Sequence, residues 1–567
     1  MKKIIAILTL SLLALQAAAQ HDEQVTVEGK YRPKVNKVDK LKLNPETPEP
    51  TYVMPSTEVN PQEAKQKFAL DLEKIAPTGF AAKNDKVFSP TKNFLMAGIG
   101  TRLSPMFLYK HNSMLTKNLG LGVGIKHNSS WLGIKDYAPS SFMSNAFDVG
   151  LSYEDMGMYR LEGGAFFDND MYHYYGVNLV ETPLTAEQIE NLCPRQVYNT
   201  IGAYVKLGPK GYPLGTPVGP GAIKYHYTYD HFGCGDGLVE LDYAYVYPVS
   251  WFGKREHPQK IRVDVDFDFN HYKCLDSLAN RGFGRLNPSF EMSGDFYRLH
   301  LGASVDGVLK KGDMSVTVRP DVSGSLFVLD KKLEFYAGLN GGQSLVTYSD
   351  LVVENPFVWQ LLDLRAKNVK FGFEGGVRTN IAEIVDLHLG VRYRHTDDDP
   401  LFVQDERDTG QSGLSNKFNL VYDETRLVSV VSDIRVKLRS SLTANINFAY
   451  NGCKLTNEEY AWYRPATEGR LKLTYDLNDK LSFNTAFLYQ GGRYAKVWDG
   501  VANWQGFNYT SEKLKDVFDL SLGADYKVND QITAFVLLDN LACQKYQLYF
   551  NYPVTGLQAY AGVKLRF

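Results

Sequence analysis

Residues 261–269 read IRVDVDFDF, and this stretch indicates the fold. Every second residue is charged, and the residues between them are apolar. Because successive side chains of a β-strand point to opposite faces, such a strand presents one charged face and one apolar face. A single strand of this kind would also suit a soluble β-sandwich. The fold class therefore depends on whether the pattern repeats along the chain.

The pattern does repeat, in segments of about ten residues from residue 93 to the end, as is typical of strands that cross an outer membrane. Clear examples are 119–125, 387–394 and 471–477. A chain that exposed one apolar face on every strand would aggregate in water, whereas a bilayer solvates that face. The sequence therefore predicts an all-β protein, an antiparallel transmembrane β-barrel formed by residues 93–567.

The connections between alternating segments are unequal in length. Short turns are expected at 329–333, 477–481 and 528–532. The long excursions lie at 128–141, 169–195, 343–367, 397–425, 453–465, 493–514 and 543–554. Counting strands so that short turns alternate with long connections gives about 22 strands. The alternation of polar and apolar residues is least regular near 196–250 and 416–440. We expect the sheet to close, because unpaired backbone groups are not tolerated in hydrocarbon.

The two ends of the chain indicate export to the bacterial outer membrane. Residues 1–19 have two lysines, an apolar run and small residues before Gln20, which predicts a cleavable signal peptide. The final alternating segment, 557–567, ends on Phe567 and resembles the signal read by the outer-membrane assembly machinery. We therefore expect that machinery and outer-membrane lipid as partners.

Several other classes of protein are excluded. Beyond the signal peptide there is no run of the ~18 apolar residues that a spanning helix needs. The net charge of −2 provides no basic field for nucleic acid. Five cysteines without CxxC pairs indicate neither a zinc ribbon nor a complete disulfide framework. No residues have the spacing of a catalytic constellation, so we expect neither an enzyme nor a cofactor.

Two polar segments contain residue types that can bind metal ions. The segment 230–236, DHFGCGD, has ligand-type residues but lacks a second His or Cys, so a polar loop is favoured. The acidic segment 397–408 could offer oxygen ligands to calcium, but it lacks the spacing of a calcium loop. A solvated cluster of surface charge is the favoured interpretation there, and no metal site is predicted.

Residues 20–92 differ from the rest, because eight prolines interrupt a lysine-rich, aromatic-poor stretch. Such a composition predicts a short extended segment without a core of its own. We expect it in the periplasm or inside the barrel, where it would cover the periplasmic mouth and prevent a leak.

The C-terminal segment 538–546, LDNLACQKY, followed by Asn551-Tyr552-Pro553, resembles the end of TonB-dependent transporter barrels. The segments 94–100, 126–130 and 134–137 resemble a branch labelled TonB-dependent receptor that lacks a full plug domain. This resemblance implies a receptor-like barrel in the outer membrane. It departs from the family in having about seventy residues before the barrel, where transporters carry a globular plug.

Two sets of functional residues follow. Val25, Thr26 and Val27 resemble the short TonB box that adds a strand to a periplasmic TonB-type protein, although a β-prone piece of a disordered tail would look the same. Alternation predicts a second set of charged residues that face the lumen. These are Arg262, Asp264, Asp266, Asp268, His388, Arg392, Arg394, Lys564 and Arg566.

Two functions remain open. The barrel could transport or capture a nutrient, or it could be a structural or assembly subunit that binds other outer-membrane or periplasmic proteins. The sequence does not identify a solute.

Overall fold

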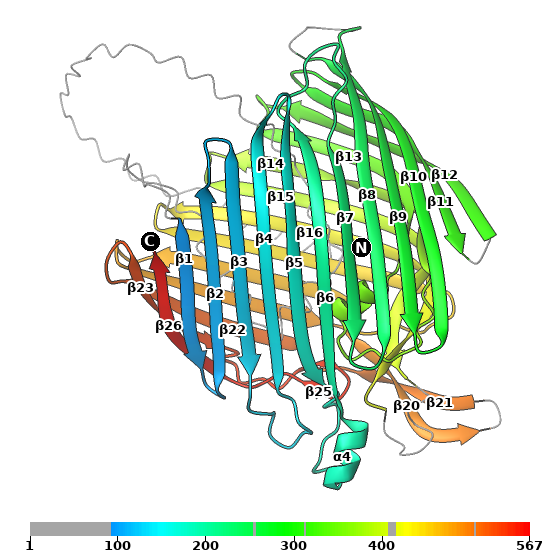
Figure 1. The fold of residues 1–567 in the computed structure, drawn as a ribbon, viewed down its shortest axis with the longest axis vertical. Coiled ribbons are helices and arrows are strands. Elements are labelled where there is room, and N and C mark those ends of the chain that lie inside the picture. Colours follow the sequence, from blue (N-terminus) through cyan, green and yellow to red (C-terminus); the bar gives the residue numbers. More distant parts are fainter. Residues whose placement is uncertain (1–91, 253–256, 311–312, 406–414, 504–505) are drawn as a thin grey trace, which may run out of the picture. The chain divides into compact units, whose positions relative to one another are not determined.

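A computed structural model of the protein describes residues 92–252, 257–310, 313–405, 415–503 and 506–567. Within these residues, a single sheet of 22 antiparallel strands runs around a closed barrel (Figure 1). The predicted fold and strand number are confirmed. No helix in the described part of the chain is both long and apolar enough to span a bilayer.

The strands of the barrel follow one another in chain order. The first half comprises β1 (Asn93–Gly100), β2 (Ser104–Met114), β3 (Leu119–Ser130), β4 (Phe142–Met156), β5 (Tyr159–His173), β6 (Arg195–Pro209), β7 (Gly221–Asp230), β8 (Cys234–Val249), β9 (Gln259–Cys274), β10 (Ser277–Ser293) and β11 (Tyr297–Lys310). The second half comprises β12 (Asp313–Val328), β13 (Leu333–Leu345), β14 (Ala366–Ile381), β15 (Val385–Gln404), β16 (Phe418–Arg439), β17 (Leu442–Leu455), β18 (Thr467–Asp476), β19 (Leu481–Gly491), β22 (Val517–Lys527), β23 (Ile532–Asp539) and β26 (Gln558–Arg566).

The barrel closes where its first and last strands meet. β26 pairs with β1 from Arg566, opposite Phe94, to Tyr560, opposite Gly100 (Figure 1). The backbones of Asn93 and Phe567 exchange hydrogen bonds of 2.8 and 3.1 Å, so Phe567 extends this pairing by one residue. Closure leaves no free sheet edge, as a hydrocarbon environment requires.

The two rims differ. The rim that holds Asn93 and Phe567, here called the terminal rim, has short turns such as 329–332, 477–480 and 528–531. The opposite rim, here called the loop rim, carries the long connections 131–141, 174–194, 346–365, 405–417, 456–466, 492–516 and 540–557. The expected alternation of long and short holds for most of the ring. On the loop rim, however, short connections join β1–β2, β7–β8, β9–β10 and β11–β12. On the terminal rim, longer connections join β6–β7 and β8–β9.

The remaining elements lie in the long connections. They are the helices α4 (Ala186–Leu192) and α5 (Tyr348–Glu354), and the pairs β20 (Tyr494–Asn503) with β21 (Gly506–Lys513) and β24 (Gln547–Tyr549) with β25 (Tyr552–Pro553). The β20–β21 hairpin reaches away from the barrel wall (Figure 1).

The outer surface of the barrel carries an apolar band. One row of directly paired residues across β3 to β6 consists of Ile125, Phe147, Phe167 and Ile201. All four side chains are exposed. A continuous apolar surface of this kind on a closed barrel is solvated by lipid, which places the protein in the outer membrane.

Candidate functional site: a loop cap over a charged lumen

The inner wall of the barrel is lined with charged side chains. On β9, Val265, Phe267 and Phe269 face outward with exposed fractions of 36, 47 and 42%. Because side chains alternate, Arg262, Asp264, Asp266 and Asp268 lie on the inner wall. Arg262 Nη2 lies 2.7 Å from Asp264 Oδ1.

Residues predicted on two other strands lie on the same inner wall. His388 Nδ1 lies 3.0 Å from Asp433 Oδ2, and Arg392 Nε lies 3.7 Å from Glu374 Oε2. Lys564 Nζ lies 2.6 Å from Asp525 Oδ1. Arg394 and Arg566 share the parity of these residues on β15 and β26. The lumen wall therefore carries ion pairs within one strand, between neighbouring strands and across an intervening strand.

The loop rim is covered by a packed cluster of loop residues, which we call the loop cap. It is built from the connections 131–141, 174–194, 346–365, 456–466 and 540–557, together with adjoining strand ends. Its fully buried members include Tyr174, Tyr348, Phe357, Trp462 and Tyr552. This cluster is the largest apolar core of the described residues, and it lies in the loops rather than between strands.

Tyrosine hydroxyls join loops that start on distant strands. Tyr174 and Tyr198, beside the β5–β6 connection, donate to the carbonyls of Val358 (3.0 Å) and Pro356 (2.9 Å) in the β13–β14 connection. From the other side, the rings of Tyr552 and Phe357 stack with centroids 3.8 Å apart. The loop cap therefore crosses the mouth of the barrel.

Helix α5 lies at the centre of the loop cap. It begins because the Thr347 side chain accepts a hydrogen bond from the Asp350 backbone N–H, and four of its seven residues are buried. Two hydrogen bonds connect the first turn of α5 to the barrel wall. Ser349 N–H donates to Asp236 Oδ2 (2.9 Å), and the Tyr348 hydroxyl donates to Asp230 Oδ2 (2.9 Å). Helix α4, by contrast, has no buried residue.

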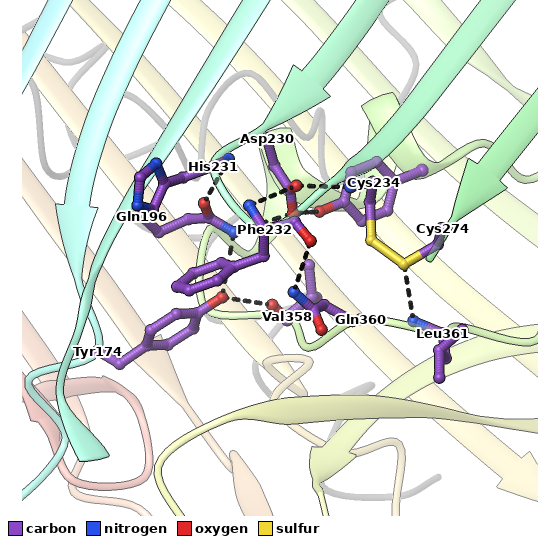
Figure 2. The surroundings of a disulfide bond; sticks show 11 residues. Tyr174, Gln196, Asp230, His231, Phe232, Cys234, Cys274, Val358, Gln360 and Leu361 are labelled. Carbon is purple, nitrogen blue, oxygen red and sulfur yellow. Dashed lines mark hydrogen bonds between the residues drawn. A yellow bond between two sulfur atoms is a disulfide. The ribbon is translucent and has the colours of Figure 1, made fainter. Parts of the chain in front are cut away.

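Asp230 organises the edge of the loop cap (Figure 2). Its carboxylate accepts hydrogen bonds from Gln196 Nε2 (3.1 Å) and from the backbone N–H groups of Phe232 (2.9 Å) and Cys234 (2.7 Å), besides Tyr348. The segment 230–236 was expected to be a polar loop. It forms a short turn between β7 and β8 with exposed His231 and Gly233 at its tip, while Asp230 at its base is only 7% exposed.

The Asp230→Ala substitution is expected to loosen the loop cap without opening the barrel wall. It leaves several buried donors without an acceptor, which costs about 2–4 kcal/mol. Limited proteolysis should therefore cut the connections 174–194 and 346–365 faster, while the strands stay protected. Asp479→Ala, in an exposed turn of the terminal rim, is the control. Equal cleavage of the two variants would contradict this role for Asp230.

A disulfide bond crosslinks β8 and β9 next to Asp230 (Figure 2). Cys234 and Cys274 face each other directly on β8 and β9 and are bonded to one another. The sequence alone assigns no pair to the five cysteines, because the pairing depends on the register of two strands. Leu361 N–H lies 3.4 Å from Cys274 Sγ, so the disulfide also contacts the β13–β14 connection. Among the described residues, Cys453 and Cys543 have free thiols, and Cys193 Sγ accepts a hydrogen bond from Asn416 Nδ2 at 3.6 Å.

The interpretation of the acidic segment 397–408 as a solvated charge cluster is wrong for Asp399, which is buried in β15. Asp397, Asp398 and Asp399 lie 2.7, 3.1 and 2.6 Å from Lys370, Arg365 and Arg464, respectively. Asp399 is only 4% exposed. Glu406 and Asp408 lie outside the described residues. Each of these three carboxylates therefore has its own cation, which leaves little charge for calcium.

One group of possible metal ligands occurs in the described chain. Suitable atoms of His395, Asp397 and Glu424 all lie within 4.8 Å of one another. However, Lys370 Nζ lies 2.7 Å from Asp397 and Arg426 Nη2 lies 3.0 Å from Glu424. These cations already neutralise the carboxylates, so the group does not support a metal site.

Burial shifts the titration of several loop-cap groups. It raises the pKa of Glu354 at the end of α5, although nearby Arg464 and Lys367 offset part of this rise. It lowers the pKa of Arg493 to about 10. The Arg493 guanidinium donates to the carbonyls of Leu548 and Lys515, both at 3.3 Å, and so joins two loops.

No protein-family model matches the sequence, and no curated protein matches it either. Solved structures, however, match the barrel closely. The ferric-catecholate import receptor Fiu of Escherichia coli K12 superimposes with a TM-score of 0.62, at 9% identity, over 84% of this chain and 82% of its own. The pyoverdine outer membrane receptor FpvA of Pseudomonas aeruginosa PAO1 gives 0.62, at 11% identity, over 84% and 79%. The chain has the fold of these outer-membrane receptors.

A third solved structure with this fold is a copper transporter. The copper transporter OprC superimposes on the barrel with a TM-score of 0.56, at 13% identity, over 85% of this chain and 81% of its own. These three neighbours are two receptors and a transporter. At such identities the similarity defines the fold and leaves the solute open.

Phe567 extends the pairing of the last strand with the first, and its side chain points outward with 56% exposure. Val25, Thr26 and Val27 lie outside the described residues, as does the segment 20–91. The loop cap is the feature that sequence reasoning missed.

Proposed function

We propose that this barrel is an outer-membrane receptor that imports a small solute through its lumen, with the loop cap as the gate. The observation that carries this proposal is the packing of loops from distant strands across one mouth, above a wall of charged side chains. A solute could bind on the loop cap and pass inward only if the contacts around α5 separate. The receptor fold supports this proposal, and the cargo of the neighbouring structures does not define the cargo here.

Coupling to a periplasmic TonB-type protein is part of the proposal. The segment Val25, Thr26 and Val27 would add a strand to the edge of a sheet in that partner. Thr26→Pro is expected to abolish uptake, because proline removes a ladder donor and fixes φ. The measurement is uptake of labelled nutrients by a deletion strain that carries each variant.

The Thr26→Pro variant should be present in the outer membrane in the same amount as the natural protein. The control is Thr47→Pro in the same segment, which should keep normal uptake. Normal, energy-dependent uptake by Thr26→Pro would remove this segment from the mechanism. No loss of uptake in the deletion strain itself would remove the transport function.

A second function, as a subunit of an outer-membrane complex, is favoured by one observation on the outer wall. A directly paired row on β3 to β6 is polar although it faces outward. Its members are His127, Asn145, Asn169 and Asn199, which are linked in turn by hydrogen bonds of 2.7, 3.1 and 2.7 Å. Polar groups on a lipid-facing surface suit contacts with another membrane protein.

Purification from mild detergent distinguishes the two functions. Stoichiometric partners that are lost on Asn169→Leu would favour the subunit. A barrel that purifies alone, from a strain in which its deletion abolishes uptake of one solute, would favour the transporter.

A further inference from the structure

The inner wall holds a cavity of about 420 Å³ near the terminal rim, on the side of the lumen away from the loop cap. It lies against strands β5 to β9. Its floor is made of small residues, among them Gly208, Gly221 and Ala222. Lys206, Asp242 and Asp266 are among the charged residues around it.

These residues belong to one row of directly paired positions across neighbouring strands. In order, the row reads Glu162, Lys206, Ala222, Asp242, Asp266 and Arg285. Ala222 stands between Lys206 and Asp242, which are two strand spacings, about 10 Å, apart. The small side chain therefore leaves a hollow between a cationic and an anionic wall.

Only some of the charged groups around this hollow are neutralised by an ion pair within the protein. Arg160 lies 3.0 Å from Glu162, and Arg262 lies 2.7 Å from Asp264, so these groups are paired. Among the described residues, the Lys206 ammonium lies over the Tyr204 ring, 5.1 Å from its centroid, and forms no salt bridge with a carboxylate. Asp242 is exposed and has no hydrogen bond or salt bridge to another described residue.

The carboxylates also repel one another. Asp242 is directly opposite Asp266, whose nearest cation is Arg285 at 3.9 Å. Like charges in such a pair destabilise a sheet, and a bound cationic group would remove the repulsion.

We propose that this cavity binds a small zwitterion, an amino acid or a short peptide with free ends. The ligand's carboxylate meets Lys206, and its ammonium group meets Asp242 and Asp266. A plain anion would face two carboxylates, and a plain cation would face Lys206. A single metal ion is disfavoured, because these carboxylates are not among the described groups whose ligand atoms converge.

This inference goes beyond the proposed function, because it concerns the opposite end of the lumen from the gate. Binding to purified barrel requires neither transport nor an open loop cap. A failure of binding would therefore leave the proposed gate untouched, and a failure of uptake would leave this site untouched.

Calorimetry on the purified full-length protein, with dialanine as the probe, tests the proposal. Dialanine should bind, and N-acetyl-dialanine and dialanine amide should each bind about tenfold more weakly, because each lacks one charge-assisted contact. Asp242→Asn should remove the preference for a free amine and keep the preference for a free carboxylate. Lys206→Gln should do the reverse.

Controls keep the result interpretable. Lys437→Gln and Asp386→Asn change inward-facing charges on the far wall and should leave binding unchanged. Ala222→Leu should abolish binding by filling the hollow without changing a charge. Each variant is first checked for heat-modifiable migration, which reports a folded barrel. Absence of dialanine binding, equal binding of the three probes, or unchanged binding in Ala222→Leu would overturn the proposal.

Discussion

Replacing residues 347–363 with a short Gly-Ser linker is expected to convert a closed barrel into an open channel. This replacement removes α5 and Phe357, and with them the surface on which Tyr174 and Tyr552 pack from opposite sides. A 22-stranded barrel without its obstruction is wider than the 16-stranded porins that conduct water and ions. Conductance of the reconstituted protein in a planar bilayer should rise from near zero to that of a wide, weakly selective pore.

The chain offers a matched control for this experiment. Helix α4 has the same length as α5 but no buried residue, so replacing 186–192 should leave the barrel closed. A closed barrel after loss of α5 would mean that the loop cap is not the barrier.

Combining the α5 replacement with removal of 21–85 tests the segment expected to cover the periplasmic mouth. If conductance appears only in the combined variant, that segment is a second barrier. If removal of 21–85 alone opens the channel, the loop cap does not seal the lumen.

A charged residue on the lipid-facing side of a strand is expected to reduce assembly of the barrel strongly. Val265→Arg places a guanidinium among Phe267, Phe269 and the acyl chains, at a cost of about 2–4 kcal/mol near the middle of the bilayer. Assembly of the barrel should fall several-fold, measured as the heat-modifiable fraction in isolated outer membranes.

Asp266→Arg is the matched variant one position along the same strand, where the side chain faces the lumen. It should assemble like the natural protein, because water and Glu or Asp side chains solvate it. Equal assembly of the two variants would contradict the assigned register of β9.

The barrel could be predicted from the sequence because its determinants are local. Alternation in segments such as 261–269 specifies a strand and its two faces, and the short turn 477–481 specifies the next strand. The long connections were recognised for the same reason, by the loss of the pattern. The ends of most of these connections agree with the structure within about five residues. The connection expected at 397–425 is wrong by eight residues at each end, because β15 continues to Gln404 and β16 begins at Phe418.

The loop cap could not be predicted, because its residues have no period and its contacts join remote parts of the chain. Nothing near Tyr174 or Phe357 in the sequence indicates that they share one core. The Cys234–Cys274 pair poses the same problem on a smaller scale, since only the register of β8 and β9 brings the two together. Ala222 was missed because its importance lies in being small between two charged neighbours two strands apart.

The long range of the loop-cap contacts also constrains the order of folding. The Tyr175 hydroxyl donates to the carbonyl of Pro553, 378 residues further along the chain. Closing a loop of that length before the intervening strands have paired has a large entropic cost, whereas the closed barrel brings both ends within reach. The loop cap should therefore form last, after the first and last strands have met. A newly inserted barrel would pass through an open, leaky intermediate whose lifetime is set by loop packing rather than by strand pairing.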